Sequence, residues 1–88
     1  MPATVEIYTT PACGYCMAAK RVLAKKGVEF AETDVWGDPE KRQHMMDRAH
    51  GGHTVPQIFI NGRHVGGFNE MMELEIDGKL DPMLQESA

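Results

Sequence analysis

The sequence contains few residues of several informative kinds. It has only two cysteines, one tryptophan, and nine lysines and arginines against thirteen aspartates and glutamates, with a formal net charge of −4. The shortage of basic residues argues against nucleic acid as the main partner, because phosphate binding needs a basic surface. No apolar run approaches the roughly 20 residues of a membrane-spanning helix. We therefore expect neither a nucleic-acid-binding nor a membrane protein.

The beginning of the chain also lacks a basic segment followed by an apolar stretch, so we expect no signal peptide. The cytoplasm is then the expected location, with an organelle matrix as the alternative if a transit segment has been removed. In such a reducing compartment a cysteine pair is expected to be catalytic or metal-binding. The 88 residues, 42% of them hydrophobic, are expected to form one domain, residues 1–88.

The two cysteines form a C-x-x-C motif, Cys13-Gly14-Tyr15-Cys16. The motif follows a β-patterned run and opens a segment with helical periodicity. At helical spacing the two Cβ atoms lie about 5–6 Å apart, so a modest adjustment closes a disulfide. The first cysteine lies against the unpaired N–H groups and the positive end of the helix dipole, which favour its thiolate. This position most often indicates redox chemistry.

Periodicity, caps and turn residues predict the element order β-α-β-α-β-β-α. The strands are expected at residues 4–9, 28–35, 55–60 and 63–65. The first helix is expected at about 14–26. The second follows the N-cap Asp38 and runs from Pro39 to about 49, and the third follows the cap Asn69 and ends at Gly78. A last short turn is expected to start at Asp81-Pro82.

This order predicts the sheet topology. The helix between the first two strands makes them parallel, and the Asn61-Gly62 turn makes the last two antiparallel. We therefore expect an α/β sandwich, a four-stranded mixed sheet with helices on both faces.

Three signatures occur in order along nearly the whole chain: Cys13-Gly14-Tyr15-Cys16, Thr54-Val55-Pro56-Gln57-Ile58-Phe59-Ile60, and Gly66-Gly67 before polar residues. Together they resemble the dithiol glutaredoxins of the thioredoxin superfamily. The resemblance implies a thioredoxin-like three-layer sandwich, a cis peptide bond before Pro56, and glutathione as the reducing co-substrate.

Within this resemblance the two cysteines receive different roles. Cys13 occupies the exposed N-terminal position and is predicted to be the attacking thiolate. Cys16 falls inside the first helical turn, where burial favours the neutral thiol, and is predicted to resolve a mixed disulfide formed at Cys13. Tyr15, between them, is expected to be exposed and to form a wall of the substrate groove.

The resemblance also implies a glutathione site. The backbone of Val55, in the loop of Thr54, Val55 and Pro56, is expected to pair with the backbone of the glutathione cysteine. Free N–H groups at Gly67, Phe68 and Asn69 suit the γ-glutamyl carboxylate, while Asn69 and Glu70 are expected to receive its ammonium group. Arg42 resembles the basic residue that meets the glycyl carboxylate in relatives, with a solvated helix-face charge as the alternative.

Three positions depart from the family pattern. Thr10 stands where many relatives have lysine, so the thiolate depends more on the helix terminus. Phe68 and Asn69 replace the usual small and acidic residues, which bears on γ-glutamyl recognition. Gly14 stands where proline is common, and it loosens the turn and removes a steric block.

The other residues of interest are interpreted as structural. Met45, Met46, Met71 and Met72 are expected in the core, Trp36 at an edge of the core, and His44 and His64 on the surface. A zinc site formed by the cysteines with His50 and His53 is disfavoured, because the spacing is longer than in zinc fingers.

The favoured function is therefore a glutathione-dependent thiol–disulfide oxidoreductase that acts on protein disulfides and glutathionylated thiols, in electron transport and cell redox homeostasis. The alternative is a dimer that shares a 2Fe–2S cluster through Cys13 and two glutathione molecules, which a small residue at Gly14 favours in the family. A thioredoxin-like protein reduced by a flavoenzyme is a third hypothesis, disfavoured by the Thr-Val-Pro and Gly-Gly signatures.

Overall fold

One mixed sheet forms the centre of the protein in a computed structural model, which describes residues 3–86. Its strands, in the spatial order β2-β1-β3-β4, are β1 (Val5–Thr9), β2 (Ala31–Asp34), β3 (Gln57–Ile60) and β4 (Arg63–Gly66). Strand β1 is parallel to β2 and antiparallel to β3, and β3 is antiparallel to β4. The parallel and antiparallel pairings predicted for β1 with β2 and for β3 with β4 are confirmed.

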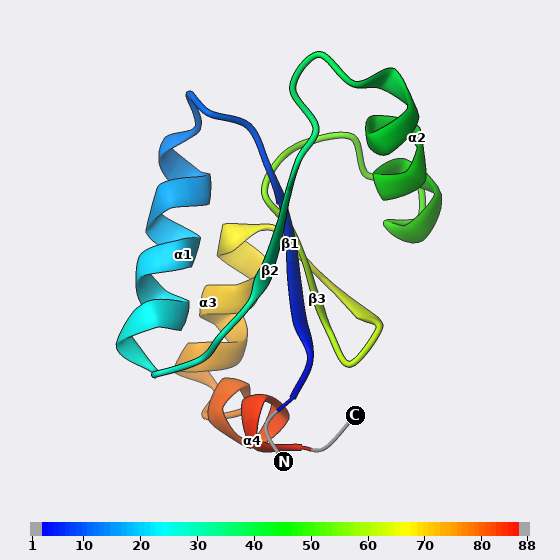
Figure 1. The fold of residues 1–88 in the computed structure, drawn as a ribbon. Coiled ribbons are helices and arrows are strands. Elements are labelled where there is room, and N and C mark those ends of the chain that lie inside the picture. Colours follow the sequence, from blue (N-terminus) through cyan, green and yellow to red (C-terminus); the bar gives the residue numbers. More distant parts are fainter. Residues whose placement is uncertain (1–2, 87–88) are drawn as a thin grey trace.

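Helices cover both faces of this sheet. Helices α1 (Gly14–Lys25) and α3 (Phe68–Ile76) lie on one face, α2 (Pro39–Arg48) lies on the other, and α4 (Leu80–Gln85) packs beside the start of β1 (Figure 1). The protein is thus the thioredoxin-like three-layer sandwich that the sequence predicts. Within residues 3–86 no helix combines the length and the apolar character that crossing a membrane requires.

Local sequence explains where the helices begin. The side chain of Asp38 accepts a hydrogen bond from the Lys41 N–H over 3.0 Å, and Pro39 follows at the first helical position of α2. Helix α1 ends at the C-cap Lys26, and Gly27 follows with a φ of 71°, a left-handed conformation that suits glycine.

The core has two parts, one on each face of the sheet. On the side of α1 and α3, Ile7, Leu23, Ile58 and Met71 are all at most 1% exposed. On the side of α2 the second part contains Tyr8, Val35, Met45, Ala49 and Phe59. Burying each large apolar side chain contributes roughly 1.5–3 kcal/mol, which holds the helices against the sheet. The methionine prediction is confirmed, with Met46 and Met72 packed partly buried against these parts.

Several predicted boundaries are wrong by a few residues. Strand β2 begins at Ala31 and not at Val28, because the Val28 N–H bonds the Leu23 carbonyl over 3.1 Å to close the end of α1. Strand β3 begins at Gln57 and not at Val55, since Pro56 has no backbone N–H to donate to a neighbouring strand. The predicted final turn is the short helix α4.

Two further predictions are corrected. Helix α3 begins at Phe68 with Gly67 as its N-cap, so Asn69 lies inside the first turn and is not the cap. Trp36 is 72% exposed and does not cover an edge of the core. Its backbone N–H donates to Oδ1 of Asp34 over 2.8 Å in the loop after β2, where the chain has left the sheet.

Candidate active site

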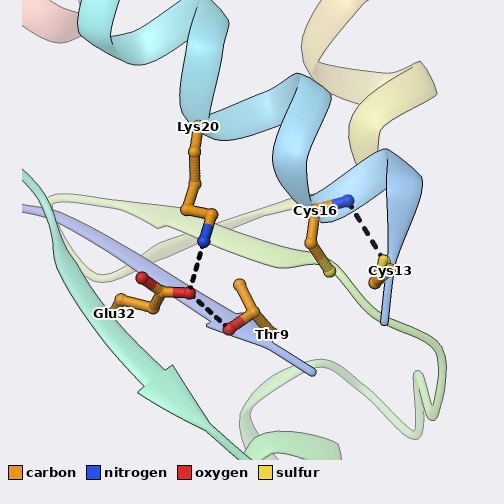
Figure 2. A network of polar contacts seen from close by, with 5 residues as sticks. All are labelled: Thr9, Cys13, Cys16, Lys20 and Glu32. Atoms are coloured by element: carbon orange, nitrogen blue, oxygen red, sulfur yellow. Dashed lines mark hydrogen bonds and ion pairs between the residues drawn. The ribbon is translucent and has the colours of Figure 1, made fainter. Parts of the chain in front are cut away.

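The turn between β1 and α1 holds the two cysteines at a helix N-terminus. Cys13 is the N-cap residue, and its Sγ accepts a hydrogen bond from the backbone N–H of Cys16 over 3.1 Å (Figure 2). No acidic residue lies in the first turn of α1. A sulfur at this place receives an N–H donor and the positive end of the helix, and both favour negative charge on it.

Cys16 differs from Cys13 in its surroundings. Its side chain is 1% exposed, whereas Cys13 is half-buried, and both are free thiols. Burial, followed by the hydrogen bond with Cys13, raises the pKa of Cys16 to about 12, and the Thr10 backbone and the charge of Lys20 only partly oppose this. The burial expected at Cys16 is confirmed, and it favours the neutral thiol there.

A polar network lies between α1 and the sheet, close to Cys16. Lys20 Nζ donates to Glu32 Oε2 over 2.8 Å, and the buried Thr9 Oγ1 donates to the same oxygen over 2.7 Å (Figure 2). Lys20, and then Thr9, lower the pKa of Glu32 below its ordinary value. Sequence reasoning missed this network. One feature of the sequence could have indicated it. Lys20 follows Cys16 by four residues, so the two side chains lie on the same face of the helix.

The loop before β3 lies against the attacking cysteine. The Val55–Pro56 bond is cis, as the resemblance implies. The Cys13 S–H donates to the Val55 carbonyl, with sulfur and oxygen 3.7 Å apart, so residues distant in the sequence meet here. Thr54 is exposed and Val55 is half-buried, which leaves the edge of this loop accessible next to the sulfur.

An aromatic pair lies beside the cysteine turn. Tyr15 is 63% exposed, as expected, and its ring centroid lies 5.9 Å from that of Phe68, at the start of α3. The two rings are tilted by 34°. The turn of the C-x-x-C motif and the N-terminus of α3 are therefore neighbours.

One of the N–H groups predicted to be free at this helix start is already paired. The Gly67 N–H donates to Glu70 Oε1 over 2.7 Å. This corrects the prediction for Gly67 and gives Glu70 a capping role. Phe68 and Asn69 occupy the first positions of α3, where N–H groups have no acceptor within the helix, and the Asn69 side chain is exposed.

Arg42 is half-buried on α2, and its Nη2 donates to the carbonyl of His53 over 3.0 Å. It is therefore not the freely solvated charge of the alternative interpretation. Its contact holds the segment that leads into Thr54. Whether it also meets a ligand stays a prediction.

The surface interpretation holds for His44, which is exposed, but is wrong for His64. His64 is half-buried, and its ring centroid lies 5.1 Å from that of Phe59. Its Nε2 lies 2.6 Å from Oε1 of Gln57, a buried side chain that sequence reasoning missed. The position of Gln57, a polar residue within the apolar run of β3, could have indicated this contact.

Across residues 3–86 no three histidine, cysteine or acidic side chains come together as metal ligands.

A cysteine pair at a strand-to-helix junction, with a cis-proline loop against its first sulfur, defines a thiol oxidoreductase of the thioredoxin-like fold. The glutaredoxin family model matches residues 5–65, and the chain belongs to the glutaredoxin family. It is 47% identical to glutaredoxin 3 of Escherichia coli K12, over 94% of this chain and 99% of that protein.

Solved structures agree with this assignment. The solution structure of glutaredoxin from Brucella melitensis is 49% identical, with a TM-score of 0.83 over 96% of this chain and 90% of that one. The crystal structure of a buckwheat glutaredoxin–glutathione complex is 29% identical, with a TM-score of 0.84 over 93% and 76% of the two chains.

Proposed function

We propose that the protein is a glutathione-dependent thiol–disulfide oxidoreductase that reduces protein disulfides and glutathionylated thiols in a reducing compartment such as the cytoplasm. The observation that carries this proposal is the position of Cys13 Sγ. It lies within 3.1 Å of the Cys16 N–H and 3.7 Å from the Val55 carbonyl. The attacking sulfur is thus next to both a donor that stabilises its anion and a backbone edge that can hold a peptide.

The reaction proceeds by thiol–disulfide exchange. The Cys13 thiolate attacks the glutathione sulfur of a glutathionylated thiol, forms a Cys13–glutathione disulfide and releases the target as a thiolate, which takes up a proton. The thiolate of a second glutathione then attacks this disulfide, releasing oxidised glutathione and restoring Cys13. With a protein disulfide, the Cys13 thiolate first attacks one of its sulfurs, forming a mixed disulfide and releasing the other sulfur as a thiolate. Cys16 then loses its proton to water and attacks the Cys13 sulfur, which forms the Cys13–Cys16 disulfide and releases the second target thiolate. Two glutathiones reduce this disulfide and leave as oxidised glutathione.

The site supplies contacts suited to each part of glutathione. The Val55 backbone, between Thr54 and Pro56, can pair with the cysteinyl backbone as a short added strand. The N–H groups of Phe68 and Asn69 suit the γ-glutamyl carboxylate, because they open a helix. The complex of the buckwheat relative supports this choice of ligand.

The remaining predicted residues surround these contacts. Tyr15 and Phe68 form an aromatic wall, Glu70 and Asn69 can receive the ammonium group, and Arg42 can meet the glycyl carboxylate. The capping contact of Glu70 occupies one of its oxygens and leaves the other for this role.

The decisive experiment compares two electron sources. We expect a glutathionylated peptide and a small disulfide to be turned over with glutathione, glutathione reductase and NADPH, and not with thioredoxin reductase and NADPH. Equal or better turnover with thioredoxin reductase would reject glutathione as the reductant and favour the thioredoxin-like alternative.

A second function, a dimer that shares a 2Fe–2S cluster, is favoured by one observation at Gly14. A Cβ added there would meet no atom within 4 Å, so the surface beside Cys13 is open. Cys13 of each subunit and two glutathione thiolates would then hold the cluster, which supplies electron transfer or cluster transfer.

This second function predicts a brown dimer after anaerobic reconstitution with iron, sulfide and glutathione. Gly14→Pro fills the open space with a ring whose fixed φ suits the first helical position. We expect this variant to lose the visible absorbance and to keep its reductase activity. Colourless, monomeric unaltered protein after reconstitution would reject the cluster.

A further inference from the structure

Two histidines face each other outside the cysteine site. His50 lies just after α2, with a φ of 55°, and His64 lies on β4. Their Nδ1 atoms are 3.4 Å apart and their ring centroids 5.5 Å apart. His50 is exposed, so the gap between the two nitrogens opens to solvent, while His64 is held against Phe59.

The hydrogen bonds of Gln57 assign the proton of the His64 ring. Gln57 Nε2 donates to the Thr54 carbonyl over 3.0 Å, so its Oε1 is the atom that faces His64 Nε2 at 2.6 Å. An amide oxygen only accepts, so Nε2 of His64 carries the hydrogen. The neutral ring then has its lone pair on Nδ1, directed at His50.

We propose that His50 and His64 bind a zinc ion between their Nδ1 atoms. Two Zn–N bonds of 2.0–2.1 Å at a tetrahedral angle place the nitrogens about 3.3–3.4 Å apart, which matches the separation observed. Imidazole is a suitable ligand for zinc. Gln57 supplies the acceptor that metal-binding histidines usually have on their second nitrogen, and it is itself buried and fixed.

A direct hydrogen bond between the His50 and His64 rings explains the separation of their Nδ1 atoms less well than a bound zinc ion does. Hydrogen bonds from N–H groups usually span 2.7–3.2 Å, and the two nitrogens are further apart than this. With two protein ligands, water or an added ligand would complete the coordination. The site uses neither cysteine, so its existence is independent of the reductase proposal.

The test titrates zinc chloride into the full chain carrying Cys13→Ser and Cys16→Ala, which removes the thiols as competing ligands. The ring nitrogens of all four histidines are followed by 1H–15N NMR. We expect one equivalent of zinc to shift Nδ1 of His50 and His64, with Nε2 of His64 still protonated, and to leave His44 and His53 unchanged.

Single substitutions in the same background measure each contribution. His50→Ala, at an exposed position, is expected to weaken zinc binding by at least about tenfold, and Gln57→Leu by roughly 10- to 100-fold. His53→Ala is the matched control and should bind as before. Unshifted His50 and His64 resonances, or zinc affinity that His50→Ala leaves unchanged and His53→Ala lowers, would overturn the proposal.

Discussion

The backbone N–H of Cys16 donates to the sulfur of Cys13 over 3.1 Å, while the side chain of Cys16 itself is buried. One residue thus has two separable parts: its backbone stabilises negative charge on the attacking sulfur, and its thiol is the group that can close the disulfide. Because the backbone part survives any change of side chain, substitution can remove the second function without the first.

The first prediction concerns these two cysteines. Cys13→Ser should abolish both deglutathionylation and disulfide reduction, because no sulfur remains to form the mixed disulfide. Cys16→Ala should keep deglutathionylation, which needs only one thiol. It should lose the reduction of those protein disulfides whose mixed disulfide with Cys13 must be released by the Cys16 thiol. Coupled assays with glutathione reductase measure both reactions. Loss of deglutathionylation in a folded Cys16→Ala protein would contradict the assigned roles.

The second prediction concerns Lys20. Its charge is one of the influences that lower the pKa of Cys16, so Lys20→Met should raise that pKa further and slow the resolving step. We expect the resolving step to slow by about threefold, because a smaller fraction of Cys16 is then present as the thiolate. Stopped-flow decay of a Cys13 mixed disulfide measures this step.

Lys25→Met is the matched control, because Lys25 is exposed on the same helix. Deglutathionylation should be the same in both variants, since it does not use Cys16. An equal slowing in the two lysine variants would show that only the net charge of the helix matters.

The network around Lys20 illustrates what sequence patterns leave out. The C-x-x-C motif predicts a helix start because capping and dipole effects act within a few residues. Glu32, however, reaches Lys20 and Thr9 only because β2 pairs with β1, where Ile7 lies opposite Glu32. Contacts of this kind depend on the register between two strands that are distant in the sequence, which a short motif such as C-x-x-C does not specify.

The third prediction concerns the aromatic wall. Tyr15→Ala should raise the KM for a glutathionylated peptide by about threefold to tenfold, which corresponds to roughly 0.6–1.4 kcal/mol of lost contact. Tyr15→Phe keeps the ring and should behave as the unaltered protein. The Tyr15 side chain is 63% exposed, so the thermal midpoint should not change. A change confined to kcat would argue against a binding role.

The fourth prediction concerns Arg48, which joins α2 to β1. Its guanidinium donates to both oxygens of Glu6, over 2.9 and 3.0 Å, and its Cζ lies 4.2 Å from the Phe59 ring centroid. Arg48→Met should lower the free energy of unfolding by about 1–2 kcal/mol, from the loss of a half-buried ion pair and a cation–π contact. Arg63→Met, which breaks the exposed ion pair with Glu86, should lower the free energy of unfolding by less than Arg48→Met does.

The effect of Arg48→Met should also depend on pH. The Arg48 hydrogen bonds hold the pKa of Glu6 below its ordinary value of 4.5 in the folded state. The ion pair therefore stabilises the protein fully above that value, and its contribution is lost as the pH falls through the lowered folded-state pKa. Urea unfolding at pH 7 and at pH 3 should show the difference between the two proteins shrinking at the lower pH.

Sequence reasoning predicted the order of the elements along the chain and the placement of the helices well, because hydrophobic period and turn residues act locally. It failed where tertiary contacts decide. His64 lies in a predicted strand and is expected to be a surface residue, yet Gln57 and Phe59 on the neighbouring strand hold it half-buried. Gly67 has an N–H that a helix start leaves free, but the Glu70 side chain returns to it.

The last prediction compares two glycines. Gly66 has a φ of 118°, and a Cβ there would lie 2.8 Å from Glu70 Oε1, the atom that caps α3 through Gly67. Gly66→Ala therefore combines backbone strain with displacement of the cap, and we expect it to lower the free energy of unfolding by more than about 1 kcal/mol.

Gly14 offers the opposite case, since a Cβ there meets no atom within 4 Å and the residue opens helix α1. Gly14→Ala should raise the free energy of unfolding by up to about 1 kcal/mol, because alanine loses less backbone entropy in a helix. Urea titrations of the two variants measure both values. Equal stability of the two alanine variants would show that neither the φ of Gly66 nor the Glu70 contact constrains the start of α3.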